Sequence, residues 1–206
     1  MAKHSKSPLP AEKVRTRRAY FDCRFGQLHV RTAFPATGGF DEQVPLFCLH
    51  SDQSSSRTFA TFLPEIADVR SVYAPDLPGL GESDPAPTSI LDGAAGAISD
   101  LADDLRLRQI DLLGLYRGAR VSLELAAARP TLVRRLVLVG LPTTDPLPAV
   151  KQQTLIMRTR LDSPDDAKLR TMMPNSKFAD IEDYASDLFA AAPKTLAKQI
   201  GTFLAG

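Results

Sequence analysis

The chain alternates short apolar runs with longer amphipathic segments. A pair of β-rich runs around Gly26 predicts a hairpin over 19–34. Further strands are predicted at 45–50, 71–76, 110–115, 134–140, 154–159 and 177–181. Helical patterns cover 59–66, 90–107, the second half of 111–130, 165–173 and 188–204. Strands that alternate with helices indicate an α/β fold, in which a mostly parallel, twisted sheet of about eight strands is covered by helices on both faces.

The length and the first residues suggest a simple domain organisation. A chain of 206 residues with 44% hydrophobic content can bury one good core, so we expect one domain over 19–206. Residues 1–18 are polar and basic, which predicts a disordered N-terminal tail. This tail contains no apolar core of the kind that a secretory signal has.

Composition excludes several classes of partner. The formal net charge is only +1, so no general electrostatic attraction favours nucleic acid or a membrane surface. No apolar stretch approaches the ~20 residues that a membrane span requires. Cys48 lies in an apolar run and is expected to be a buried free thiol. We therefore expect a cytoplasmic protein without metal or cofactor, since no metal-ligand pattern is visible.

The segment 111–130 contains the most informative local pattern. Gly114 and Gly118 flank Tyr116 between a short apolar strand and an alanine-rich helix. This is the spacing of a nucleophile elbow, in which a sharp strand-to-helix turn projects the central residue above the sheet. The glycines suit such a turn because the backbone passes close to its neighbours. Here the central residue is tyrosine and not serine.

Other motifs appear in a consistent order along the chain. His50-Ser51 follows a strand, Asp76-Leu-Pro-Gly-Leu-Gly-Glu-Ser-Asp84 follows the next strand, and the elbow follows in turn. Together these motifs resemble the α/β-hydrolase superfamily (hydrolase-1 type) over 20–204. The resemblance implies a three-layer α/β-hydrolase fold. It also implies that the usual cap domain is missing, because only a short connector, 141–153, separates two strands where the cap is normally inserted.

The resemblance assigns triad positions that hold unusual residues. Tyr116 stands at the nucleophile position, Ser186 at the histidine position and Asp162 at the position of the acid. The three histidines of the chain are His4, His29 and His50, and only His50 is expected near the site, in a structural role. A hydrolytic triad needs a nucleophile, an imidazole base and an orienting carboxylate, so the standard triad is degenerate.

Two readings of Tyr116 remain open. Its ring can fill the vacated pocket, or its hydroxyl can react if a nearby arginine such as Arg117 or Arg120 lowers its pKa. Candidate ligand-binding residues lie at the carboxyl ends of the predicted strands, where open α/β sheets bind ligands. They are His50, Ser51, Asp52, Arg117, Arg158 and Arg160. A solvent-facing role is the simpler explanation of the arginines.

These observations lead to two main functional hypotheses. The first is a non-catalytic pseudoenzyme that binds a small molecule or another protein, such as a complete hydrolase. The alternative is a hydrolase or lyase-like enzyme that uses Tyr116 and Asp162 on an ester, lactone or related small molecule. A third is a degenerate gene product without selected activity. An uncapped apolar surface formed by Tyr116, Leu141, Pro142 and Leu161 would favour a homodimer, unless the pocket collapses around the tyrosine.

Overall fold

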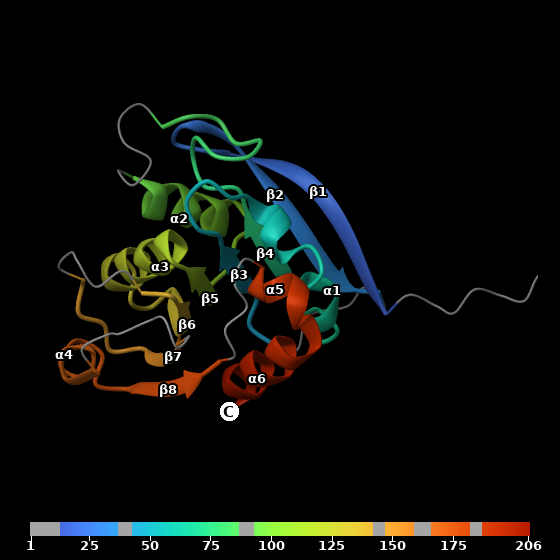
Figure 1. Ribbon diagram of the computed structural model, residues 1–206. Helices are drawn as coiled ribbons and strands as arrows, with labels where there is room; N and C mark the ends of the chain where they lie inside the picture. Colours follow the sequence, from blue (N-terminus) through green and yellow to red (C-terminus); the bar gives the residue numbers. More distant parts are fainter. Residues whose placement is uncertain (1–12, 37–42, 87–92, 142–146, 159–165, 182–186) are drawn as a thin grey trace, which may run out of the picture.

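The protein forms an eight-stranded sheet with helices on both faces (Figure 1). The computed structural model describes residues 13–36, 43–86, 93–141, 147–158, 166–181 and 187–206. The strand order is β1-β2-β4-β3-β5-β6-β7-β8. The pairs β1–β2 and β2–β4 are antiparallel, and every later pair is parallel. This arrangement confirms the predicted α/β-hydrolase architecture.

The elements follow the chain in the predicted sequence. The strands are β1 (Val14–Cys23), β2 (Gly26–Pro35), β3 (Leu46–Leu49), β4 (Val72–Pro75), β5 (Ile110–Leu115), β6 (Val133–Val139), β7 (Gln153–Arg158) and β8 (Ser176–Asp180). The helices are η1 (Ser56–Phe59), α1 (Leu63–Ile66), α2 (Ala94–Asp104), α3 (Arg117–Ala128), α4 (Asp166–Met172), α5 (Leu188–Ala191) and α6 (Pro193–Ala205).

The central strands bury side chains on both faces, which is why they are almost continuously apolar. In β5, Leu112 belongs to the core beneath α2 and α3, whereas Leu113 belongs to the core beneath α1, α5 and α6. Leu136 and Val137 of β6 divide in the same way. Because successive side chains of a strand point to opposite faces, one sheet contributes residues to both cores.

The hairpin begins earlier than its sequence indicates. We predicted that residues 1–18 form a tail, but β1 starts at Val14 and pairs with β2 from Val14–Pro35 to Cys23–Gly26. Residues 14–18 therefore belong to the sheet. Charged side chains are tolerated there because β1 is an edge strand with a largely exposed surface.

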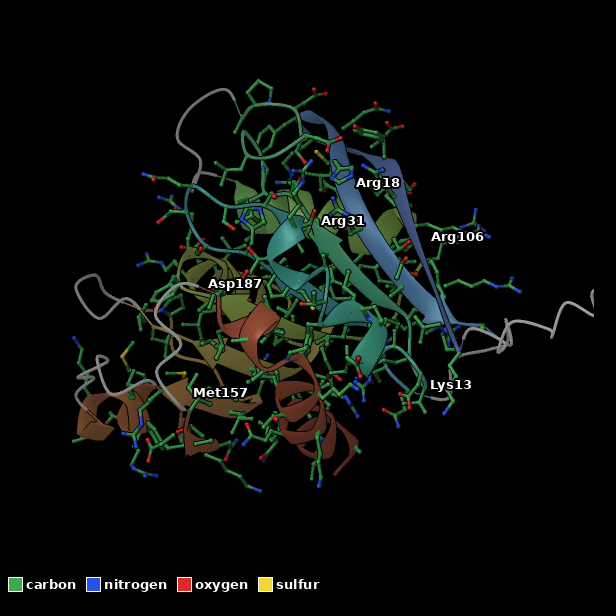
Figure 2. The ribbon with its side chains drawn as sticks, turned by 45° about the vertical axis from the view of Figure 1, so that its right-hand side comes forward. Lys13, Arg18, Arg31, Arg106, Met157 and Asp187 are labelled. Atoms are coloured by element: carbon green, nitrogen blue, oxygen red, sulfur yellow. The ribbon has the colours of Figure 1, made fainter. Side chains whose placement is uncertain are left out.

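Two arginines on this hairpin lie directly opposite each other. Arg18 of β1 is paired in register with Arg31 of β2, and Figure 2 shows their side chains beside each other. Like charges at directly opposite positions weaken a strand pair slightly. Positive charge along an edge strand also disfavours pairing with another strand of the same kind.

Two predicted helices are each divided. The pattern over 59–66 forms η1 and α1, and the pattern over 188–204 forms α5 and α6. Pro64 lies in the first turn of α1, and Pro193 is the first residue of α6. Proline has no backbone N–H to donate to the preceding turn, so it begins a helix readily and interrupts one that would run through it.

No cap domain is evident between β6 and β7. These strands are separated by residues 140–152, of which 142–146 lie outside the described residues. The described part of this interval contains no inserted helix. Throughout the described ranges, moreover, none of the helices combines the length and the apolar run needed to cross a membrane.

Candidate functional site

The predicted elbow is present at the carboxyl end of β5. Tyr116 joins β5 to α3 with φ 49° and ψ −104°, a backbone conformation that is uncommon for a residue with a side chain. Its N–H donates to the carbonyl of Val139 on the neighbouring strand (2.8 Å), and its own carbonyl accepts from Ala119 (3.0 Å). These bonds hold the strained turn in place.

The two elbow glycines are required by close backbone contacts. A Cβ atom on Gly114 would lie 2.5 Å from the carbonyl oxygen of Gly118. A Cβ atom on Gly118 would overlap the carbonyl group of Leu49 at the end of β3. The small residues therefore let α3 start directly against β3 and β5, which confirms their predicted role.

Gly118→Ala is expected to lower the free energy of unfolding by about 1–3 kcal/mol, because the added methyl group would overlap backbone that cannot rotate away. The matched control is Gly201→Ala in α6, where no atom lies within 4 Å of the added Cβ. That change should stabilise the protein by about 0.5–1 kcal/mol. Urea unfolding followed by circular dichroism measures both, and equal effects would contradict the steric account.

The side chain of Tyr116 is only partly packed. Its ring lies so close to Gly140 that a Cβ atom there would overlap it, and Gly140 has a φ of +64°. The tyrosine nevertheless remains 47% exposed. The ring therefore packs against the end of β6 and is not enclosed in a buried pocket.

His50 connects two loops at the carboxyl edge of the sheet. Its Nε2 accepts a hydrogen bond from the N–H of Leu77 (2.9 Å), so Nδ1 carries the proton that it donates to the carbonyl of Ser51 (2.8 Å). Burial lowers the pKa of this imidazole, which favours the neutral ring. Both ring nitrogens thus have structural partners, as the sequence suggested.

Asp76 organises the glycine-containing loop that follows β4. Its carboxylate accepts hydrogen bonds from the N–H groups of Ser56 (2.5 Å) and Glu82 (2.9 Å), and it pairs with Nδ1 of His29 (2.9 Å). Burial by itself raises the pKa of Asp76, but these hydrogen bonds outweigh it and hold the pKa below its ordinary value. Gly81 is needed beside it, since a Cβ atom there would overlap the carboxylate.

The partner of His29 was not apparent from the sequence. It lies on the hairpin, as expected, and the antiparallel pairing of β2 with β4 brings it to Asp76. Both side chains are about 2% exposed. No local motif signals this pair, because the two residues are 47 positions apart in the chain.

The predicted anion-binding residues have carboxylate neighbours. Asp52 forms an ion pair with Arg117, which is the first residue of α3. Arg158 at the end of β7 pairs with Asp180 at the end of β8 (2.8 Å). These guanidinium charges are therefore partly compensated already, so an anion would have to compete with a carboxylate for them.

Several predicted residues are not described by the structure. The triad-equivalent Asp162 and Ser186 and the candidate ligand residue Arg160 lie outside the described residues. Pro142 and Leu161 of the predicted apolar surface lie outside them too. Leu141 is partly buried against the core beneath α3. Self-association through this surface therefore stays a prediction.

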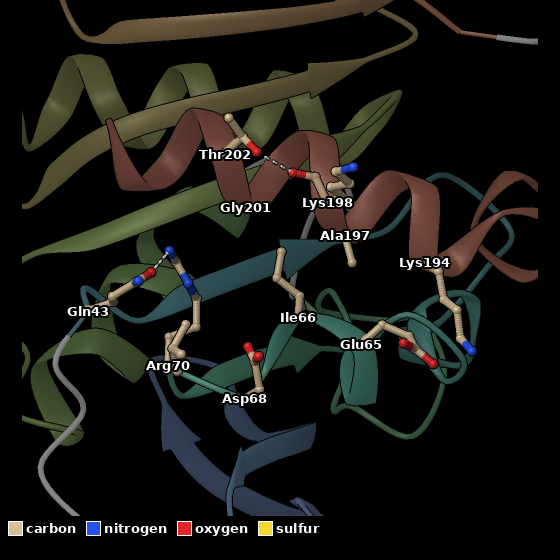
Figure 3. A pocket seen from close by; sticks show the side chains of 11 residues that line it. Gln43, Glu65, Ile66, Asp68, Arg70, Lys194, Ala197, Lys198, Gly201 and Thr202 are labelled. Atoms are coloured by element: carbon tan, nitrogen blue, oxygen red, sulfur yellow. Dashed lines mark hydrogen bonds between the residues drawn. The ribbon is translucent and has the colours of Figure 1, made fainter.

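Two hollows lie elsewhere on the molecule. One, of about 410 Å³, lies beside the contact between α1 and α6 (Figure 3). The other, of about 650 Å³, lies between the end of α3 and the residues before β7. Neither is lined by Tyr116.

The family of the chain follows from a comparison with known families. A model of the alpha/beta hydrolase fold family matches residues 44–196, which is more than half of the chain. The chain therefore belongs to the α/β-hydrolase fold family, as the motifs around the elbow indicated.

Curated relatives with similar sequences are hydrolases. The chain is 36% identical over 120 residues to a 2-hydroxymuconate semialdehyde hydrolase of a Pseudomonas species, covering 52% of this chain and 41% of that protein. It is 40% identical over 83 residues to a 2-hydroxy-6-oxo-2,4-heptadienoate hydrolase of Pseudomonas putida, covering 39% and 30%. The chain thus spans less than half the length of these two relatives.

Solved structures share the fold at low sequence identity. A predicted CIB-like hydrolase from Thermoplasma acidophilum superposes with a TM-score of 0.80 at 16% identity, covering 93% of this chain and 98% of that chain. The haloalkane dehalogenase DbeA from Bradyrhizobium elkani gives a TM-score of 0.77 at 15% identity, with the same coverage. At these identities the similarity establishes the fold alone.

Proposed function

We propose that this protein is a hydrolase-like enzyme in which Tyr116 acts at the elbow in place of serine. The observation that carries the proposal is the tyrosine itself, which occupies the strained elbow and remains 47% exposed. An inactive replacement would be expected to pack away its ring. The relatives are hydrolases, which favours this alternative over the non-catalytic hypothesis.

The elbow offers a hydroxyl group and a backbone N–H for a reaction at a carbonyl group. Arg117 is the first residue of α3, so its N–H has no acceptor within the helix and is available to a substrate oxygen at the elbow. The positive end of the helix dipole favours the negative charge that develops on that oxygen. The hydroxyl of Tyr116 either attacks the carbonyl carbon or exchanges a proton with the reactants.

The nucleophilic route can be written as a balanced reaction. The phenolic oxygen of Tyr116 loses its proton and bonds to the carbonyl carbon of an ester or lactone, and the alcohol leaves with a proton. Water then cleaves the resulting aryl ester, releasing the acid and restoring the phenol. The names of the relatives suggest a narrower substrate class, the 2-hydroxy-6-oxo-dienoic acids, which the same site would cleave with water.

Tyr116→Phe is expected to lower kcat/KM by about 10²–10⁴-fold, because positioned proton transfer contributes that much and a phenyl ring has no hydroxyl group. The assay uses a panel of esters, lactones and 2-hydroxy-6-oxo-dienoates. Tyr20→Phe is the matched control, since Tyr20 is 52% exposed on β1. A Tyr116→Phe variant as active as the unchanged protein would remove Tyr116 from the reaction.

A second candidate function is ligand binding without catalysis. It is favoured because both described histidines have structural partners and neither is placed as a catalytic base. His29 pairs with Asp76, and His50 bridges Leu77 and Ser51. His4, the remaining histidine, lies outside the described residues. The binding function is favoured by two results together. No compound of the panel is turned over, and one compound raises the melting temperature of the protein by the same amount with and without Tyr116→Phe.

A further inference from the structure

The hollow between α1 and α6 has the dimensions of a small-molecule site. Its volume of about 410 Å³ falls within the range of ordinary ligand pockets. One wall comes from α1 and the residues that follow it, and the other wall comes from α6 (Figure 3). Since Tyr116 does not line this hollow, it is separate from the elbow.

Opposite charges line the two walls without forming ion pairs. Glu65 and Asp68 belong to the first wall, and Lys194 and Lys198 belong to α6. In the described part of the chain, no ion pair within 4.0 Å involves any of these four side chains. The hollow thus keeps carboxylates and ammonium groups apart.

The inner end of the hollow holds a buried arginine. Arg70 is 1% exposed and donates to Gln43 and to Asp111 (3.3 Å). Its Nε is buried and has no hydrogen-bond partner among the described residues. Because Asp111 also binds Arg134, one buried carboxylate serves two guanidinium groups. Asp68 of the first wall also stabilises the charge of Arg70, so the positive charge that faces the hollow from α6 belongs to Lys194 and Lys198.

Gly201 keeps the hollow open on the α6 side. No atom lies within 4 Å of a Cβ added at this position, although the glycine is in the interior of a helix. Glycine weakens a helix interior relative to alanine. A larger side chain here would extend into the space between the two walls.

We propose that this hollow binds a small zwitterion, specifically a free α-amino acid. The ammonium group would face Glu65 and Asp68, and the carboxylate would face Lys198 of α6. A purely anionic ligand would meet the two carboxylates, and a purely cationic ligand would meet the lysines. Only a molecule with both charges complements both walls. The proposal does not depend on the function of the elbow.

The test compares matched ligands by isothermal titration calorimetry at about pH 6.5, where an α-amino group is protonated. The probes are L-leucine, N-acetyl-L-leucine, which is only anionic, and L-leucinamide, which is only cationic. L-methionine and L-phenylalanine extend the amino-acid set. We expect a free amino acid to bind at least about tenfold more tightly than either singly charged analogue, because each analogue loses one charge-assisted interaction.

Substitutions locate the site. Lys198→Met and Asp68→Asn should each weaken binding at least about tenfold, whereas Lys151→Met, outside the hollow, should leave it unchanged. Gly201→Phe should block binding while Gly201→Ala permits it. The exposed positions of Lys198 and Asp68 keep the test valid even if Gly201→Phe does not fold.

Three results would overturn the proposal. Equal binding of either singly charged analogue would replace the zwitterion site by a simple anion or cation site. Undiminished binding to Lys198→Met and Asp68→Asn would place the ligand elsewhere. Absence of binding for all three amino acids in the millimolar range would leave the hollow without this function.

Discussion

Asp111→Leu is expected to lower the free energy of unfolding by about 3–5 kcal/mol. Asp111 is fully buried and accepts from Arg70 (3.3 Å) and Arg134 (2.6 Å). Without the carboxylate, the guanidinium group of Arg70 would stay in the core with an uncompensated charge. Chemical unfolding in urea or guanidinium chloride, followed by circular dichroism, measures the loss.

A double variant separates charge from packing. Adding Arg70→Met to Asp111→Leu removes both buried charges, and it should recover most of the lost stability. Arg134→Met alone should cost less than Asp111→Leu, because Arg134 is 28% exposed and its loss leaves Asp111 with Arg70. If the double variant were no more stable than Asp111→Leu, the unpaired charge would not be the cause.

Asp76→Ala is expected to cost more than about 3 kcal/mol, since it removes the acceptor of three donors. The N–H groups of Ser56 and Glu82 and the Nδ1 of His29 would lose their partner together. Each unsatisfied buried donor costs about 1–3 kcal/mol. Unfolding at neutral pH measures this loss, and His29→Phe serves as the control that removes one donor and leaves the carboxylate with two. A smaller loss for Asp76→Ala than for His29→Phe would contradict this account.

The carboxylate of Asp76 should also make the stability of the protein depend on pH. The pKa of Asp76 is lower in the folded protein than the ordinary value of about 3.9, so its contribution is fully present above about pH 3.9. That contribution is lost as the pH falls through the folded pKa. The unchanged protein should therefore lose more stability between neutral pH and acid than Asp76→Ala does. Parallel stability curves for the two proteins would rule out this linkage.

The sequence predicted the arrangement of the sheet because its signals are local. The apolar runs of the parallel strands, the glycine spacing around Tyr116 and the turn formers after Asp76 each fix a short segment. Their order along the chain then limits the topology. The start of β1 at Val14 was missed, since an edge strand with arginines at exposed positions has no apolar run to mark it.

The contacts within the site could not be predicted in the same way. Asp52 and Arg117, or His29 and Asp76, come from different elements, and only the register of the folded sheet brings them together. The partly exposed position of the Tyr116 ring beside Gly140 is likewise marked by no sequence pattern. The roles assigned to the triad-equivalent positions therefore stay predictions.

The place of β3 in the sheet has a consequence for the order of folding. β3 lies between β4 and β5, and residues 50–109 separate it from β5 along the chain. Closing so long a connection loses chain entropy before the strand gains its second neighbour, whereas β1 and β2 need only a two-residue turn, 24–25. The hairpin can thus form early. Until β5 pairs with it, β3 has one unpaired edge, and its four apolar residues are exposed to association with other unfolded chains.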